Sequence, residues 1–345
     1  MFLSSFDLFL AFATSFALVG SLTPLMRKVA IKKQIIDKPN SAHKSHKKAV
    51  PYLGGVAIMI GVIVVVYSSL FLKHQSTNYF LIATYLIAPA TLLGIVGLID
   101  DIRNLSPLPR FIAQSSAALF STMILASTDS FGNPTSSPIF DFLISVFWII
   151  GICNSINFFD NIDGGAAGTA AISSVGVAVI SLHNKQFLIA AFSIILIGAM
   201  MGFLIWNKPP ARIYMGDAGS LFLGFLLAIL TVRLKPVTQE TIGSYAIPIL
   251  LLATPILDTS IAVVSRIANH NSPFTGGTDH LSHRLVAQGF SRKITIFVLQ
   301  LITFIFSMLA ILIAISNLNE IAIVAFGFIL FLVLSFYFAK SSILK

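Results

Sequence analysis

Charged residues are scarce in this chain of 345 residues, where they make up 10% of the sequence against 56% hydrophobic residues. The mean hydropathy is +0.92. Soluble globular domains carry about a quarter of their residues as charged side chains, so this composition excludes a soluble fold. Longer polar stretches are confined to residues 27–51 and 266–292. The sequence therefore predicts an all-α polytopic membrane protein, with one integral-membrane domain over residues 1–345.

Other features are missing as well. Cys153 is the only cysteine, so an internal disulfide is excluded, and its place in an apolar run predicts a small buried hydrophobe. The chain has no Walker motif and no dinucleotide-binding fingerprint. The first apolar stretch lacks a preceding basic region and a clear small-residue cleavage site, so we expect a retained first helix.

Long apolar runs are what the sequence has in abundance. Runs of roughly 17 to 25 residues match the thickness of a bilayer. They predict about eleven transmembrane helices, at residues 6–26, 52–72, 79–99, 110–127, 139–158, 166–183, 187–206, 217–233, 243–265, 293–316 and 318–339.

The net charge of +9 is distributed unevenly over this topology. All but four of the 22 basic residues fall in one set of loops, and the exceptions are Lys73, Lys185, Arg233 and Lys235. The positive-inside rule places the larger set in the cytoplasm, with the N-terminus outside and the C-terminus inside. This bias accounts for the positive net charge, so binding to nucleic acid is not needed to explain it. The Lys-rich stretch 27–51, with His43 and His46, is either this topogenic signal alone or also a contact for anionic lipid headgroups.

Acidic residues at helix ends form three segments on the predicted cytoplasmic side. They are costly in a lipid environment unless a cation or proton balances them. The segments are "LIDDIRN" (98–104) with Asp100 and Asp101, "NSINFFDNIDGG" (154–165) with Asp160 and Asp163, and "RIYMGDAGS" (212–220) with Asp217. The stretch "GGTDHLSHRL" (276–285), with His280 and His283, joins them on that side.

The spacing within the second segment predicts one polar face. Asn154, Asn157 and Asp160 are three residues apart, and the two glycines after Asp163 allow a tight turn. Capping of a helix end explains any one such segment, but not three on one side. Carboxylates in this number suit Mg²⁺, with Mn²⁺ as a substitute, together with a bound diphosphate. The glycines that flank Asp217 are expected to leave room for that complex.

In these motifs the chain resembles the polyprenyl-phosphate N-acetylhexosamine-1-phosphate transferases, whose fold is shared with the phospho-MurNAc-pentapeptide transferases. The resemblance rests on "HKKAVPYLGG" (46–55), the three acidic segments and "SPFTGGTDHLSHRL" (272–285), in this order. It implies transfer of a sugar 1-phosphate from a UDP-sugar to undecaprenyl phosphate, at the cytoplasmic face of a bacterial inner membrane. The products are an undecaprenyl-diphospho-sugar and UMP, for envelope polymers such as lipopolysaccharide. Membrane lipids are the other partners, and a homodimer is left open.

The resemblance also implies roles for individual residues. Asp100 and Asp101 are expected to be catalytic, beside the lipid phosphate and metal, and Asp217 to be a Mg²⁺ ligand. The remaining candidates are expected to bind the nucleotide sugar or its diphosphate: Asn154, Asn157, Asp160, Asp163, Arg266, His280 and His283.

Two positions depart from the pattern usual in that family. Asn161 stands where glycine is common, and Ser282 stands where a histidine is common. The absence of three consecutive histidines favours UDP-GlcNAc over UDP-MurNAc-pentapeptide. Two alternatives remain: an inactive relative, for which Ser282 is the support, and a secondary transporter with Asp and Asn as ion ligands. Clustering of the acidic residues on one side argues against the transporter.

Overall fold

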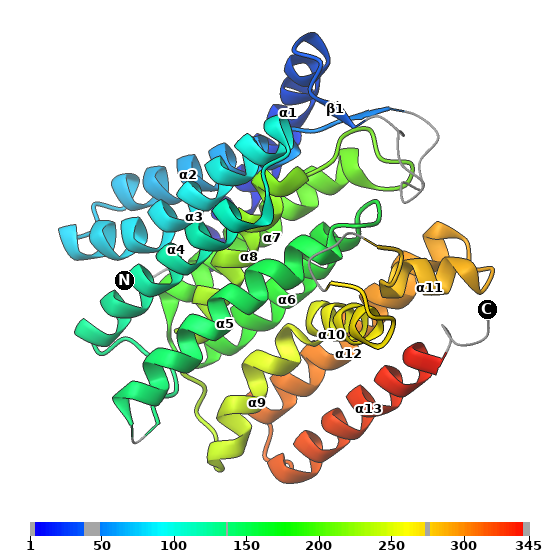
Figure 1. The fold of residues 1–345 in the computed structure, drawn as a ribbon. Helices are drawn as coiled ribbons and strands as arrows, with labels where there is room; N and C mark the ends of the chain where they lie inside the picture. The colour runs from blue at the N-terminus through cyan, green and yellow to red at the C-terminus, as the bar shows by residue number, and fades with distance from the viewer. Residues whose placement is uncertain (1–3, 38–48, 136, 273–276, 341–345) are drawn as a thin grey trace.

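A computed structural model describes residues 4–37, 49–135, 137–272 and 277–340. These residues form thirteen α-helices and one antiparallel pair of two-residue strands (Figure 1). The elements are α1 (Ser5–Lys32), β1 (Ile36–Asp37), β2 (Val50–Pro51), α2 (Gly54–Leu72), α3 (Thr77–Arg103), α4 (Pro107–Ser127), α5 (Pro138–Phe159), α6 (Gly165–His183), α7 (Phe187–Asn207), α8 (Gly216–Val232), α9 (Thr241–Leu251), α10 (Ala253–Ala268), α11 (Leu281–Ala287), α12 (Arg292–Ile315) and α13 (Glu320–Lys340).

The predicted all-α membrane class is confirmed. Within the described ranges, eight helices are long and apolar enough to cross a membrane, and a ninth span results if the bent pair α9 and α10 is counted as one. Every predicted span coincides with a helix or with that pair. Helix α8 is apolar but shorter than these eight helices, and α4 is not one of the eight. The number eleven and the orientation therefore stay predictions.

The predicted single helix over residues 243–265 was wrong, because α9 and α10 meet at an angle of 73°. Pro255 has no N–H and cannot donate to the carbonyl of Leu251, four residues earlier. The Ser173 hydroxyl donates to that carbonyl instead, at 2.7 Å. A helix break at membrane depth persists only where such partners satisfy the freed backbone groups.

Helix α8 forms the centre of the bundle and carries the third acidic segment at its start. All of its residues except Asp217 and Val232 are buried, which explains its nearly continuous apolar sequence. In Figure 1, α2, α3 and α4 lie on one side of the bundle and α12 and α13 on the other. A Cβ atom at Gly55 would come within 2.1 Å of the Gly219 backbone, so these two glycines let α2 and α8 approach closely.

Two sequence motifs are joined through the backbone next to the start of α8. The N–H of Tyr214 donates to the Pro51 carbonyl at 2.9 Å, and the N–H of Gly54 donates to the Tyr214 carbonyl at 3.0 Å. This pairing fixes the residues before α2 against the loop that leads into α8. Residues 38–48 of the Lys-rich stretch, which include His43 and His46, lie outside the described residues.

Candidate active site

A cavity of 660 Å³ opens where α3, α5 and α8 meet the α11 segment. All five carboxylates of the acidic segments line it, as the sequence predicted for one side of the membrane. Asn157, His280 and His283 line it as well. The lining residues that sequence reasoning had not assigned to the site include Tyr52, Arg110, Tyr214 and Arg292.

Arg110 joins two of the acidic segments. Its Nη1 lies 2.8 Å from an oxygen of Asp100 and 3.0 Å from an oxygen of Asp217. Sequence reasoning counted Arg110 only as a topogenic charge, although its place directly after the first acidic segment was a usable signal. Because two carboxylates converge on one nitrogen, the guanidinium offsets their mutual repulsion.

Asp101 holds the start of α8. Its two carboxylate oxygens accept the N–H groups of Asp217 and Ala218, at 2.9 and 3.1 Å. An acidic side chain at this place satisfies donors that have no partner within the helix. Gly216 has a φ of 70°, and a Cβ there would come within 2.5 Å of the Asp101 carboxylate. The prediction that this glycine leaves room for a metal–diphosphate complex is therefore wrong, because the carboxylate of Asp101 takes that space.

The polar face of α5 divides into two parts. Asn157 donates to Asp217 at 2.8 Å and to the Ser220 hydroxyl at 2.9 Å, so it orients Asp217 in the cavity. Asn154, one turn deeper, does not line the cavity. Its amide donates to the Gln114 side chain at 2.7 Å and to the Ile150 carbonyl at 2.8 Å. Asn154 thus fixes α5 against α4.

The loop after α5 carries Asp160 and Asp163. Asp163 is buried, and its carboxylate accepts the N–H of Ala211 at 2.9 Å, which ties this loop to the segment before α8. Burial raises the pKa of Asp160 well above its usual range, and the negative charges of Asp217 and Asp101 raise it further. The crowding of carboxylates in this cavity therefore favours the binding of a proton or a cation.

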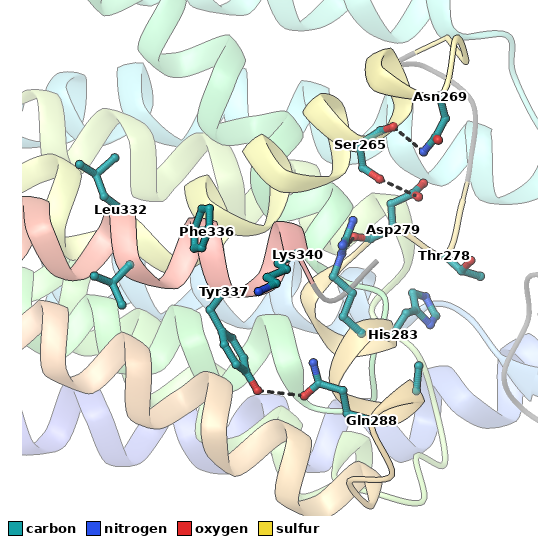
Figure 2. A pocket seen from close by; sticks show the side chains of 13 residues that line it. Ser265, Asn269, Thr278, Asp279, His283, Gln288, Leu332, Phe336, Tyr337 and Lys340 are labelled. Atoms are coloured by element: carbon teal, nitrogen blue, oxygen red, sulfur yellow. Dashed lines mark hydrogen bonds between the residues drawn. The ribbon is translucent and has the colours of Figure 1, made fainter. Parts of the chain in front are cut away.

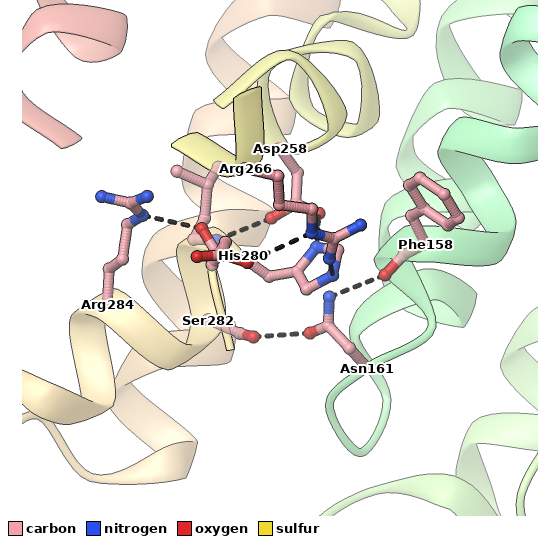
Figure 3. Close-up of polar contacts among 9 residues, drawn as sticks. Phe158, Asn161, Asp258, Arg266, His280, Ser282 and Arg284 are labelled. Carbon is pink, nitrogen blue, oxygen red and sulfur yellow. Dashed lines mark hydrogen bonds and ion pairs between the residues drawn. The ribbon is translucent and has the colours of Figure 1, made fainter. Parts of the chain in front are cut away.

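His280 belongs to a buried polar network (Figure 3). Its Nδ1 lies 2.7 Å from Asp258, and its Nε2 lies 3.2 Å from an Arg266 nitrogen. Arginine can only donate, so Nε2 accepts and Nδ1–H donates to Asp258. Asp258 is fully buried within an apolar run and was missed, although an acidic residue inside such a run is itself a signal. Both ring nitrogens of His280 are thus engaged by protein groups.

Arg266 and His283 differ in how they relate to the cavity. Arg266 does not line it, because the guanidinium is buried against Asp279 at 3.1 Å and lies over the Phe158 ring. His283 lines it directly. Burial lowers the pKa of His283, and the neighbouring His280 lowers it further. At neutral pH His283 is therefore an uncharged hydrogen-bonding group and not a cation.

A larger groove of 1140 Å³ adjoins the cavity and shares His283 with it (Figure 2). One wall consists of apolar side chains of α13, among them Leu332, Val333 and Phe336. The opposite wall carries polar groups of α10, of α11 and of the segment between them, which includes Asp279. The groove therefore has one apolar wall and one polar wall beside the acidic cavity.

The donor set of the cavity fits Mg²⁺. The described residues contain no group of three or more His, Cys, Asp or Glu side chains placed to hold a metal ion. Mg²⁺ is commonly bound by only one or two carboxylates, with water and substrate phosphates as the other ligands. Asp100 and Asp217 already direct one oxygen each to a single cationic nitrogen. These two carboxylates are the residues that fit the ion.

Comparison with known proteins identifies the family. Residues 83–235 match glycosyl transferase family 4. A probable undecaprenyl-phosphate N-acetylglucosaminyl 1-phosphate transferase of Bacillus subtilis is 35% identical over 306 residues, which covers 87% of this chain and 83% of the relative. The chain therefore belongs to glycosyl transferase family 4. Its motifs resemble those of the polyprenyl-phosphate N-acetylhexosamine-1-phosphate transferases. The match indicates that the protein is a phosphosugar transferase.

Two further relatives show the range of the family. A decaprenyl-phosphate N-acetylglucosaminephosphotransferase of Mycobacterium leprae is 30% identical, over 72% of this chain and 69% of the relative. A phospho-N-acetylmuramoyl-pentapeptide-transferase of Bacillus mycoides is 29% identical, over 65% of this chain and 73% of the relative. These matches leave the transporter interpretation without support.

Proposed function

We propose that the protein transfers N-acetylhexosamine 1-phosphate, most directly GlcNAc 1-phosphate, from a UDP-sugar to undecaprenyl phosphate. The products are undecaprenyl-diphospho-sugar and UMP, and the reaction takes place at the cytoplasmic face of a bacterial inner membrane. The observation that carries the proposal is the meeting of all five acidic-segment carboxylates in one cavity beside a groove with an apolar wall. Two relatives whose names specify a polyprenyl-phosphate acceptor and N-acetylglucosamine support it.

The cavity and groove separate the two substrates by their chemistry. The apolar wall of α13 suits a prenyl chain, and the acidic cavity suits a diphosphate that arrives with a divalent cation. In the reaction, an oxygen of the lipid phosphate attacks the phosphorus attached to the sugar. The bond from that phosphorus to the bridging oxygen breaks, and UMP leaves with this oxygen. Positioning and charge stabilisation account for most of the catalysis in such transfers.

Asp217 and Asp100 are the residues that would hold Mg²⁺, which when bound neutralises charge on the diphosphate. Arg110 then turns from these carboxylates to a phosphate oxygen. Asp100 is also assigned the proton of the lipid phosphate. One of its oxygens accepts the N–H of Leu105, but the other is released once Arg110 turns to the phosphate, whereas both oxygens of Asp101 hold the start of α8. Asp101 acts as a positioning residue in this scheme.

The sugar end of the donor is assigned to the Asn161, His280 and His283 side of the cavity. Ser282 in place of histidine, and the identity to N-acetylglucosamine-transferring relatives, favour GlcNAc over MurNAc-pentapeptide. Asp160 and Asp163, which shape the loop after α5, face the nucleotide.

Purified protein incubated with undecaprenyl phosphate and a panel of UDP-sugars tests this function, with UMP release as the measurement. UDP-GlcNAc should give UMP, and UDP-MurNAc-pentapeptide should give at most a small fraction of that rate. A folded protein that releases no UMP from any donor contradicts the proposal. Preference for the pentapeptide donor would keep the reaction class and overturn the assigned sugar.

A further inference from the structure

A cluster of positive charge lies at the opposite end of the bundle from the acidic cavity. Lys185, Arg233 and Lys235 line one cavity of 330 Å³. They are three of the four basic residues that the charge distribution assigned to the outer side. The fourth, Lys73, is ion-paired with Asp7 at 2.5 Å. Among the described residues that line this cavity, none is acidic, so the three positive charges have no carboxylate in its wall.

Two segments that are hydrogen-bonded to each other carry the three basic residues of this cavity. Lys185 occupies the turn between α6 and α7 with a φ of 56°, and Arg233 is the C-cap residue directly after α8. The N–H of Lys235 donates to the Gln186 side chain at 3.1 Å, so the turn and the end of α8 are fixed to each other. Helix α8 alone separates the cluster from Asp217 by about 25 Å. The cluster is therefore not part of the transferase site.

Arg233 supplies the observation that points to a ligand. Its side chain is partly exposed and lines this cavity, while its Nε is buried and has no hydrogen-bond partner among the described residues. A buried donor left in this state is costly, and nearly all such groups in native proteins have a partner. Lysines at the ends of membrane helices often only extend toward water, which suffices to explain the exposed Lys185 and Lys235. That reading does not explain a guanidinium nitrogen withdrawn from solvent.

The remaining wall indicates the kind of ligand. Gln186 and the first residues of α7 line the cavity, so the positive end of that helix dipole adds to the cluster. Ile82, Leu188 and Ile189 provide apolar surface beside it. We propose that Lys185, Arg233 and Lys235 bind a phosphate group at this end of the bundle, carried by a phospholipid headgroup or present as free phosphate.

Native mass spectrometry of the purified, delipidated protein tests the proposal with three probes: dioleoylphosphatidylglycerol, dioleoylphosphatidylcholine and inorganic phosphate. Two variants are compared with the wild type. The double variant combines Lys185→Gln and Lys235→Gln, and the triple variant adds Arg233→Gln. Lys73→Gln is the matched control, because it removes a positive charge from the same side outside the cavity. Both multiple variants should bind phosphatidylglycerol about tenfold or more weakly, while Lys73→Gln binds as the wild type does.

The probes separate the two sources of phosphate. Loss of phosphatidylglycerol binding in the multiple variants, with phosphatidylcholine unaffected, assigns the site to an anionic lipid headgroup. Loss of inorganic phosphate binding alone assigns it to free phosphate. If all variants match Lys73→Gln with every probe, the proposal is overturned. Size-exclusion chromatography verifies folding, and if the triple variant aggregates, the double variant, which keeps Arg233, decides by the same criteria.

Discussion

The hydroxyl of Ser282 donates to the side-chain oxygen of Asn161 at 2.5 Å (Figure 3). These two residues are the positions at which the chain departs from the pattern usual in its family. Asn161 also donates to the Phe158 carbonyl at 2.7 Å. The pair therefore ties the loop after α5 to α11, across one side of the acidic cavity. The two departures are one structural feature, which weakens the interpretation of Ser282 as a sign of lost activity.

Removal of either partner should lower kcat/KM for the UDP-sugar by about fivefold, since one buried neutral hydrogen bond contributes about 1 kcal/mol. The effects of Ser282→Ala and Asn161→Ala should not multiply fully, because both remove the Ser282–Asn161 bond, and only Asn161→Ala also removes the bond to the Phe158 carbonyl. Steady-state UMP release by the two single variants and the double variant measures this coupling. Effects that multiply would show that the two side chains act separately.

Replacement of Arg110 should reduce turnover by about 100-fold, because Asp100 and Asp217 lose their shared cation and the diphosphate loses a positive group. Arg110→Lys keeps the charge but offers one nitrogen on a flexible stem, so it should recover only part of the rate. Arg103→Gln is the matched control, since Arg103 is exposed at the end of the same acidic segment. Equal rates for Arg110→Gln and Arg103→Gln would show that Arg110 does not contribute to catalysis.

The adjacent residues Asp100 and Asp101 should respond differently to the same substitution. An amide in place of the Asp101 carboxylate offers one acceptor to two N–H groups, so Asp101→Asn should lower both the Tm and the rate, at a stability cost of about 1 kcal/mol. Asp100→Asn should lower the rate and weaken the apparent Mg²⁺ affinity, and it should lower the Tm less than Asp101→Asn does, because an amide oxygen can still accept the single N–H of Leu105. Thermal unfolding and Mg²⁺ titration of UMP release measure both. Identical behaviour of the two variants would contradict the separate roles.

The orientation predicts which cysteine substitutions react in sealed cells. In a Cys153→Ala background, Ser272→Cys should resist a membrane-impermeant thiol reagent until the membrane is opened. Val237→Cys, at a side chain that is 75% exposed near the start of α9, should react in intact cells. The reverse pattern would place the acidic cavity outside, away from a cytoplasmic UDP-sugar pool.

Much of the fold could be predicted from the sequence because the bilayer sets the length of apolar runs. The grouping of the acidic segments followed from charge asymmetry alone, and all five carboxylates do line one cavity. The helix break at Leu252 could not be predicted from the sequence, because the apolar run continues across Pro255. The Ser173 hydroxyl, which donates to the freed Leu251 carbonyl, lies far away in the chain.

Side-chain partners were the least predictable part of the site. Arg110 looked like one more topogenic charge, and Asp258 was hidden in an apolar run until His280 was seen beside it. The glycines near Asp217 suggested space for a ligand, whereas Gly216 makes room for Asp101 and Gly219 for the Gly55 backbone. In each case the deciding contact comes from a distant segment, which local pattern does not reveal.

UMP release from UDP-GlcNAc and undecaprenyl phosphate, measured for the wild type and for Asp217→Asn with Mg²⁺ or with excess EDTA, tests the proposed transferase most directly. The wild type should turn over with Mg²⁺ and stop in EDTA. Asp217→Asn keeps the side-chain volume and should remain folded, but turnover should fall by at least about 100-fold, because a lost metal ligand removes several kcal/mol of transition-state stabilisation. Undiminished release in EDTA, or a folded Asp217→Asn variant with a near-normal rate, would contradict a metal-assisted transfer centred on this carboxylate.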